Sequence, residues 1–210
     1  MTSLRERKKA ATRQRIADLA TAMFFERGFD AVTISEIADA ADVSKVTVFN
    51  YFPRKEDIFF DRQPQAQQML TSAIRDRRRG ESPLRALRRL LLDLIEQRHA
   101  LAGLRDGHTL FWRTVLNSPA LRARARENLE RLERDLADVI AETSDDPAPG
   151  LTAALAIAAY RVAYTTGAAR ILAGEAAEDV IPDHVAAVDR AFDVLDKGTA
   201  HPHRPRPRRS

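Results

Sequence analysis

Residues 33–59 read TISEIADAADVSKVTVFNYFPRKEDIF and hold a dense set of helix signals. Thr33 with Glu36 three residues later is a capping box, which opens a short helix. Ser44 caps a second short helix after a tight turn, and Pro53 ends it. Two short helices joined by a turn, with longer helices on both sides, are typical of a helix-turn-helix. The two short helices are expected over about 34–40 and 44–51.

The second short helix has two unlike faces. Val48 and Phe52 lie one turn apart and should pack inward against Ile37 and Ala38. An exposed, mostly polar face of this width fits the major groove of DNA, although one polar face alone is more typical of a solvated surface. The turn, the caps and a basic N-terminus occur together, and that combination favours DNA. The exposed face comprises Val46, Thr47, Asn50 and Tyr51.

The rest of the chain also reads as helix, which predicts an all-α fold of about nine helices. Pro64 should kink or interrupt the fourth helix, and Gly and Pro otherwise fall at helix ends. The expected domains are an N-terminal helix-turn-helix domain at 1–56, a helical domain at 57–198 and a disordered basic tail at 199–210. The other helices are expected over about 7–27, from Pro53 to Arg79, from Ser82-Pro83, over 106–116, from Ser118-Pro119, and over 151–173 and 183–196.

The charge of the 210-residue chain is uneven. Residues 1–15 carry a net charge of +5, residues 201–210 carry +4, and the body between them carries −5. Basic ends suit a polyanion, or they only aid solubility, which is the simpler explanation for the tail. The chain has no cysteine, which excludes thiolate metal sites and fits a reducing compartment. No signal peptide and no apolar run of about 20 residues are present, so we expect a cytoplasmic protein without membrane contact.

Residues 12–59 closely resemble the DNA-binding domain of the TetR family of bacterial regulators. The order and spacing of the matching residues hold across the whole segment. They are Ile16, Ala20, Phe24, Gly28, Phe29, Thr33, Ile34, Ile37, Ala38, Ala41, Val43, Ser44, Thr47, Tyr51, Phe52, Lys55 and Glu56. Two positions depart from the family, because Val46 replaces a frequent glycine and Phe49 replaces a frequent tyrosine that contacts phosphate.

The resemblance implies a role for each residue of the helix-turn-helix. Lysine suits guanine, asparagine suits adenine, and Val46 is able to meet a thymine methyl group. Residues 5–15 are implied to reach the DNA backbone or a neighbouring minor groove. The implied base contacts are Ser44, Lys45, Val46 and Asn50. The implied phosphate contacts are Thr33, Thr47, Tyr51 and Lys55.

The family also implies that the second domain binds a small molecule and forms a homodimer. Helical stripes are usually plain core, so pocket and core remain alternatives for each pocket candidate. Small residues on the helix over 151–173 and larger ones on the helix over 183–196 predict an isologous dimer, with protomer core as the alternative. The pocket candidates are His108, Phe111, Trp112, Tyr160 and Tyr164. The interface candidates are Ala156, Ala159, Ala163, Gly167, Val185, Val188, Phe192 and Leu195.

The sequence therefore predicts a DNA-binding transcriptional regulator, a repressor that a small-molecule effector releases from a palindromic operator. It would work in the bacterial cytoplasm, associated with the nucleoid when bound. No catalytic motif, cofactor or metal site is expected. The alternatives are a helical ligand-binding protein without DNA activity and a di-metal carboxylate enzyme, the latter because Glu96 and His99 form one Glu-x-x-His pair.

Overall fold

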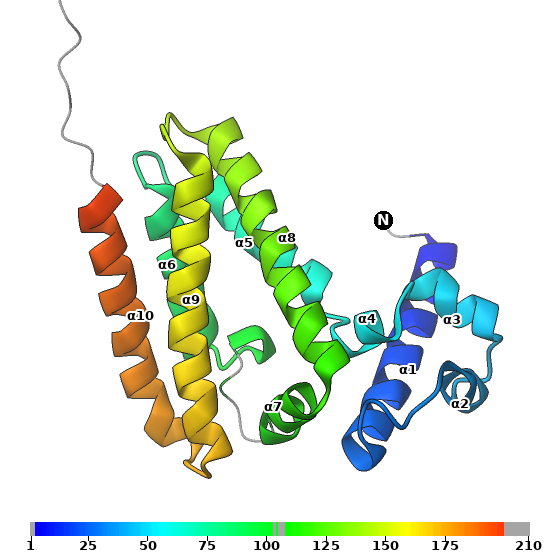
Figure 1. The fold of residues 1–210 in the computed structure, drawn as a ribbon. Coiled ribbons are helices and arrows are strands. Elements are labelled where there is room, and N and C mark those ends of the chain that lie inside the picture. Colours follow the sequence, from blue (N-terminus) through cyan, green and yellow to red (C-terminus); the bar gives the residue numbers. More distant parts are fainter. Residues whose placement is uncertain (1–2, 103, 105–107, 200–210) are drawn as a thin grey trace, which may run out of the picture. The chain divides into compact units, whose positions relative to one another are not determined.

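The computed structural model describes residues 3–102, 104 and 108–199, and these residues form helices and the turns between them (Figure 1). The prediction of an all-α fold is confirmed, with ten α-helices and one 3-10 helix in the described ranges where about nine were expected. In chain order they are α1 (Leu4–Arg27), α2 (Ile34–Ala40), α3 (Lys45–Tyr51), α4 (Lys55–Phe59), α5 (Gln63–Arg75), α6 (Pro83–Glu96), η1 (Ala100–Ala102), α7 (His108–Asn117), α8 (Pro119–Thr143), α9 (Pro149–Leu172) and α10 (Ala177–Thr199).

The chain divides into two compact units. Unit 1 contains Met1–Ala66 and Asp106–Glu130, and unit 2 contains Gln67–Arg105 and Arg131–Ser210. The expected DNA-binding segment, residues 1–56, lies within unit 1, which also takes in α4, α7 and the first half of α8. The expected boundary at residue 56 stays a prediction, and most of the tail expected at 199–210 lies outside the described residues.

The core of unit 1 is one apolar cluster that α1, α2, α3 and α4 share with α7 and α8. Phe24, Phe29 and Phe59 meet at its centre, with ring centroids 4.9 to 6.2 Å apart in tilted and edge-on pairs. Gly28 ends α1 with a φ of 84°, a conformation that glycine adopts without strain. The cluster therefore holds the short helices α2 and α3, which are too short to be stable alone.

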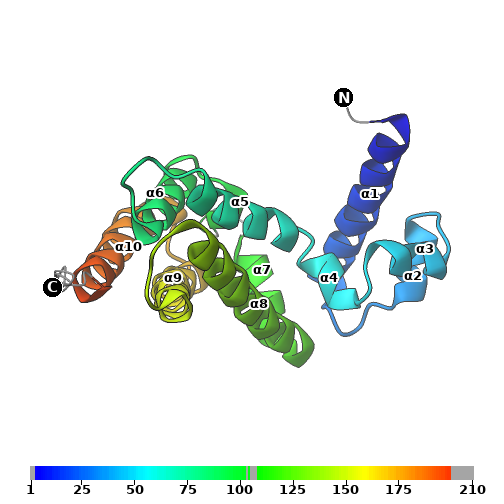
Figure 2. The ribbon, with the colours of Figure 1, turned by 90° about the horizontal axis from the view of Figure 1, so that it is seen from above.

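Unit 2 is a helical bundle in which α9 and α6 both pack on α10 (Figures 1 and 2). Gly167 of α9 leaves room for two side chains, since a Cβ atom there would lie 2.9 Å from Leu104 Cδ2 and 3.1 Å from His184 Nδ1 of α10. Arg88 of α6 also reaches α10, where its guanidinium donates to Asp189 at 2.8 Å and to Asp193 at 2.5 Å. Side-chain packing against Gly167 and the ion pairs of Arg88 thus hold α10 within the unit.

Two helix boundaries lie near prolines, and only the second differs from the prediction. The helix that Pro64 was expected to kink or interrupt is interrupted: α4 and α5 are separate helices, and Pro64 lies in the first turn of α5, where a missing N–H costs nothing. In contrast, α10 begins at Ala177 and continues through Pro182, although a start at 183 was expected. The extra turns survive because Ala177 and Val180 are buried against the cluster around Leu104 and Ile171.

Candidate nucleic-acid interface

A tight turn joins α2 to α3. Asp42 in this turn has a φ of 51°, in the left-handed region that aspartate tolerates better than most residues. The Val43 N–H donates to the Ala38 carbonyl at 3.0 Å, which closes α2, and the Ser44 hydroxyl accepts from the Thr47 N–H at 3.0 Å, which opens α3. The direction of α3 is therefore set by hydrogen bonds on both sides of the turn.

One face of α3 is buried as the sequence predicts. Val48 and Phe52 are 0% and 1% exposed, and they belong to the same cluster as Ile37 and Ala38 of α2. Burial of each large apolar side chain stabilises the unit by about 1.5–3 kcal/mol, so rotating α3 about its axis would be costly. The opposite face is consequently held outward.

The outward face of α3 brings the four predicted base-contact residues together in exposed positions. Phe49 joins them, with 49% of its surface exposed, and the prediction of the exposed face had left it out. Its spacing of three residues from Val46 was the available signal, because such residues are neighbours on a helix. Tyr51 lies at the edge of this face, half-buried against the core of unit 1.

The Thr33 hydroxyl is already engaged at the start of α2. It donates to the Glu36 carboxylate at 2.7 Å and accepts from the Glu36 N–H at 3.3 Å, while the Thr33 N–H donates to the same carboxylate at 2.8 Å. These bonds, together with Arg27 at 2.6 Å, lower the pKa of Glu36 to about 2. The Thr33 hydroxyl thus already binds a carboxylate, and the phosphate contact expected of it stays a prediction.

Lys55 bridges α4 to the turn between α1 and α2. Its ammonium group donates to the carbonyls of Phe29 and Val32, both at 2.9 Å, and lies 4.2 Å from the centroid of the Phe29 ring. Partial burial lowers its pKa, although Asp30 and Glu56 oppose the shift. Two of the three ammonium hydrogens therefore have partners in the protein, and one is left for the phosphate predicted here.

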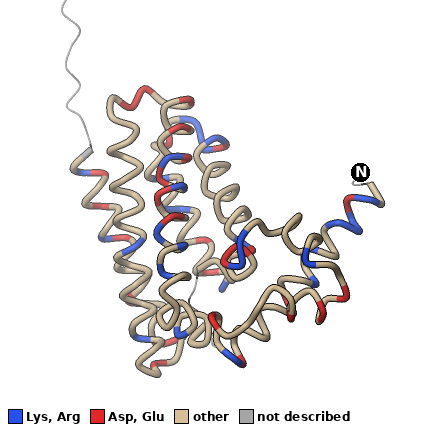
Figure 3. The backbone as a smooth tube through the Cα atoms, turned by 45° about the vertical axis from the view of Figure 1, so that its right-hand side comes forward, with Lys and Arg blue, Asp and Glu red and all other residues tan. Residues whose placement is uncertain are grey.

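The basic N-terminal segment is helical from Leu4 (Figure 3). The Ser3 hydroxyl accepts from the Glu6 N–H and the Glu6 carboxylate accepts from the Ser3 N–H, which is a capping box that the sequence analysis did not identify. Arg13 turns back into unit 1, donating to the Asp61 carbonyl at 3.1 Å with its guanidinium 4.5 Å from the centre of the Phe52 ring. The exposed basic residues of this segment are Arg5, Arg7, Lys8, Lys9 and Arg15.

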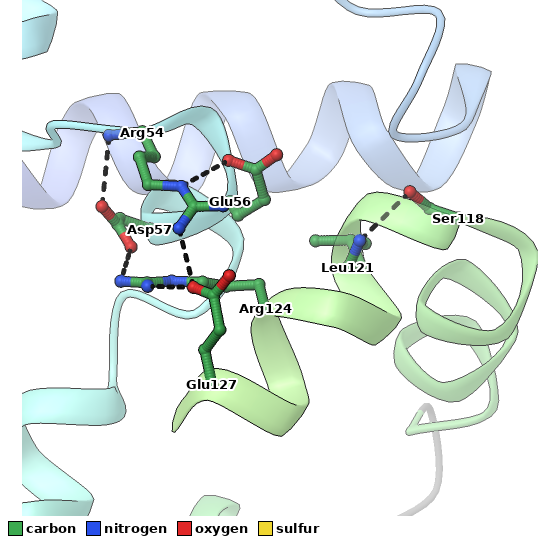
Figure 4. Close-up of polar contacts among 7 residues, drawn as sticks. All are labelled: Arg54, Glu56, Asp57, Ser118, Leu121, Arg124 and Glu127. Atoms are coloured by element: carbon green, nitrogen blue, oxygen red, sulfur yellow. Dashed lines mark hydrogen bonds and ion pairs between the residues drawn. The ribbon is translucent and has the colours of Figure 1, made fainter. Parts of the chain in front are cut away.

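A network of charged side chains joins α4 to α8 (Figure 4). Arg124, only 8% exposed, donates to Asp57 at 2.5 Å and to Glu127 at 2.8 Å. Arg54 binds the same Glu127 at 2.7 Å and lies 3.6 Å from Glu56. Arg124 and Arg54 lower the pKa of Glu127, in that order of effect. No sequence motif predicts this network, which fastens α4, the helix directly after α3, to α8.

The predicted pocket residues of α7 belong to unit 1. Phe111 stacks on Phe59, with ring centroids 5.0 Å apart at 18°, and its ring also meets that of Trp112 edge-on at 5.4 Å. The rings of His108 and Phe111 are 6.2 Å apart. Phe111 packs against the core cluster of this unit, as Val115 does, and a pocket role for His108 and Trp112 stays a prediction.

The two predicted tyrosines belong to unit 2. Tyr160 and Tyr164 stack with centroids 5.2 Å apart at 21°, and burial raises the pKa of Tyr160 to about 12. Tyr160 borders a small cavity of about 20 Å³ whose other lining residues are all apolar. This volume is far below the roughly 300–1,000 Å³ of typical ligand pockets. The other lining residues are Leu70, Leu87, Leu91, Leu132, Leu136, Ala156, Ile157 and Phe192.

Most of the predicted interface residues lie inside the single chain. Five are buried in unit 2, which makes them part of the packing of one protomer, and three are partly exposed. Larger apolar side chains are exposed elsewhere on the same helices, namely Leu151 and Val162 on α9, at 60% and 61%, and Val194 on α10, at 68%. The five buried residues are Ala156, Ala163, Gly167, Val188 and Phe192, and the other three are Ala159, Val185 and Leu195.

The structure gives no support to a metal site in the part of the chain that it describes. None of its His, Asp and Glu side chains gather in a group of three or more able to hold an ion. His99, half of the Glu-x-x-His pair, accepts the Leu101 N–H at its Nδ1 atom, at 3.2 Å. Among the same residues, no helix has both the length and the apolar character that a membrane crossing requires.

Three comparisons place the chain among known proteins. A sequence model of bacterial regulatory proteins of the tetR family matches residues 16–61, which run from the middle of α1 to just past α4. The chain is 29% identical to the HTH-type transcriptional regulator TcmR of Streptomyces glaucescens over 173 residues, which cover 76% of this chain and 74% of TcmR.

Solved structures of regulators share the fold over most of both chains. FadR of Thermus thermophilus, a TetR family transcriptional repressor in complex with lauroyl-CoA, is 28% identical with a TM-score of 0.55, covering 93% of this chain and 98% of FadR. NalD, the secondary repressor of the MexAB-OprM multidrug efflux pump in Pseudomonas aeruginosa, is 18% identical with a TM-score of 0.56, covering 87% and 97%. The likeness to NalD concerns the fold alone.

Proposed function

Because the chain belongs to the TetR family of bacterial transcriptional regulators, we propose that it represses genes by binding a palindromic operator as a homodimer, and that a small molecule releases it. The observation that carries the proposal is the outward face of α3, fixed by a buried opposite face and flanked by an exposed basic helix. It acts by binding and has no catalytic step. Its place of work is the bacterial cytoplasm, on the nucleoid when bound.

The outward face of α3 supplies the chemistry for base recognition. Lys45 donates to guanine acceptors, and the Asn50 amide forms a donor and acceptor pair with adenine. Asn50 is exposed and stands free of the core, so its replacement should leave the fold intact. Lys55 would bind phosphate through its third ammonium hydrogen, since the other two are bonded within the protein. The exposed cations of α1 add an attraction to the DNA backbone that does not depend on sequence.

The test begins with genomic fragments recovered by the full-length protein, from which the preferred duplex is sequenced. Asn50→Ala should then lose about 1–3 kcal/mol of preference for that duplex over its scrambled version. Asn117→Ala, an exposed asparagine of α7 in the same unit, is the matched control and should bind as the wild type does. A preference that survives Asn50→Ala unchanged would show that Asn50 does not read the bases.

The exposed apolar residues of α9 and α10 support a homodimer in which these helices pair across a two-fold axis. Such a dimer must set two α3 helices about 34–36 Å apart to read a palindrome. Val162→Glu and Val194→Glu should shift the mass measured by light scattering toward the monomer and weaken operator binding. Arg134→Glu on the exposed side of α8 is the control. Phe192, 2% exposed, is unsuitable because its replacement would disrupt the core.

Unit 2 is the proposed effector-binding unit. Its cavity beside Tyr160 is apolar but holds only about 20 Å³, so an effector must bind a more open form. A molecule that binds that form better lowers DNA affinity by linkage. The FadR relative carries lauroyl-CoA, which makes acyl-CoA thioesters the first probes, with coenzyme A as the control. If no member of a panel of acyl thioesters and other apolar compounds releases the bound operator, this part of the proposal is contradicted.

A further inference from the structure

Two apolar side chains stand outward on α3, and only the first of them, Val46, was expected on this face. Val46 is 68% exposed and Phe49 is 49% exposed, and the three-residue spacing makes them neighbours on the helix. The apolar residues that unit 1 needs from α3 are Val48 and Phe52, which are buried on the other side. Val46 and Phe49, named here the apolar pair, therefore contribute little to the core and remain in contact with solvent.

The surroundings of the apolar pair decide which partner fits it. Lys45 and Asn50, both exposed, lie beside it on the same helix, and the exposed cations of α1 belong to the same unit. A partner that covers the pair must then be polyanionic and carry a small apolar group between hydrogen-bonding edges. In the major groove of DNA, the 5-methyl group of thymine is the apolar feature that the bases present.

We propose that Val46 and Phe49 read pyrimidine 5-methyl groups, so that each operator half-site carries thymine at the base steps that face them. The inference rests on the proposed DNA-binding function. Neighbours three residues apart on a helix have Cβ atoms about 5–6 Å apart, which allows the pair to face bases on adjacent steps of the duplex. Neither side chain is able to hydrogen-bond to a base edge, so the methyl group is what they distinguish.

Phe49 is thereby a specificity residue. The family's frequent tyrosine at this position offers a hydroxyl to phosphate, and phenylalanine exchanges that sequence-independent contact for an apolar surface. An operator in which cytosine replaces a facing thymine should regain affinity when that cytosine is 5-methylated, because the same methyl group returns to the same place in the groove. This protein would thus respond to cytosine methylation of its site.

The experiment uses the full-length protein and the duplex recovered by selection. Thymine is replaced by uracil at one position at a time, which removes the methyl group and keeps every hydrogen bond. At the positions facing the pair, affinity should fall about fourfold for each methyl group, the value of one buried methylene. In the double variant Val46→Ala, Phe49→Ala, the same replacements should change affinity by less than about twofold. Both residues are exposed, so the urea unfolding midpoint of the variant should match that of the wild type.

The outcomes separate the inference from the proposed function. If uracil changes the affinity at no position while recognition of the duplex still depends on Asn50, the proposed reading of methyl groups is overturned and the proposed DNA-binding function stands. Recovery of no preferred duplex would overturn both. A fourfold loss that persists in the double variant would assign the methyl contact to other residues and refute the role of the apolar pair. Phe49→Tyr keeps the ring and should retain the sensitivity to uracil.

Discussion

Replacing Arg124 by methionine is expected to loosen α4 from α8. Arg124 is 8% exposed, and its guanidinium donates to the carboxylates of Asp57 and Glu127, whose side chains are 20% and 44% exposed. Removing one partner of a fully buried ion pair costs about 3–5 kcal/mol. Here water reaches both carboxylates and Arg54 still donates to each, so the loss should be about 2 kcal/mol of unfolding free energy.

Urea denaturation of the full chain, followed by circular dichroism, measures this loss. Arg126→Met is the matched control, since Arg126 lies exposed on the same helix and should change stability by less than about 0.5 kcal/mol. A cycle with Asp57→Asn isolates the pair, and we expect a coupling of about 1 kcal/mol or more between Arg124 and Asp57. Additive effects within about 0.5 kcal/mol would refute the view that this ion pair fastens α4.

Three further predictions follow from single contacts. The pKa of Glu36 is lowered to about 2 in the folded chain, so its contribution to stability is present above pH about 4.5 and is lost toward pH 2. The difference in unfolding free energy between wild type and Glu36→Gln should therefore be larger at pH about 4.5 than at pH about 2, where it should vanish. Gly167→Ala should destabilise unit 2 by about 1–3 kcal/mol, because the added methyl would lie 2.9 Å from a leucine carbon, whereas Gly198→Ala meets nothing within 4 Å and should be neutral in the same thermal melt. Lys55→Met should cost about 1–3 kcal/mol of stability by leaving two carbonyls without their donor, and a melt that is unchanged would mean that Lys55 acts only on DNA.

Local signals predicted the helix-turn-helix well. The Thr33 and Glu36 capping box and the Ser44 cap act over three residues, so they can be read from the sequence directly, and the structure places α2 and α3 within a residue of the expected bounds. The inward positions of Val48 and Phe52 followed from helical spacing alone. Such interactions depend little on the rest of the fold.

Contacts distant in sequence could not be predicted in this way. The interface residues were chosen because they are small or apolar, but such residues also fill a protomer core, and only the packing of α9 on α10 shows that Ala163 and Phe192 are buried. Arg124 carries no motif, and its partner Asp57 is 67 residues away. The continuation of α10 through Pro182 depends on the burial of its first turns, which local propensity does not contain.

The position of the one tryptophan makes the chain convenient for spectroscopy. Trp112 belongs to unit 1, while two of the three tyrosines, Tyr160 and Tyr164, belong to unit 2. Light at the red edge of the absorption band excites indole alone, so the tryptophan emission reports on unit 1, which carries α3. Tyrosine difference spectra report mainly on unit 2, because two of the three tyrosines belong to it. The order in which the two units lose structure can therefore be followed in one sample, without a label.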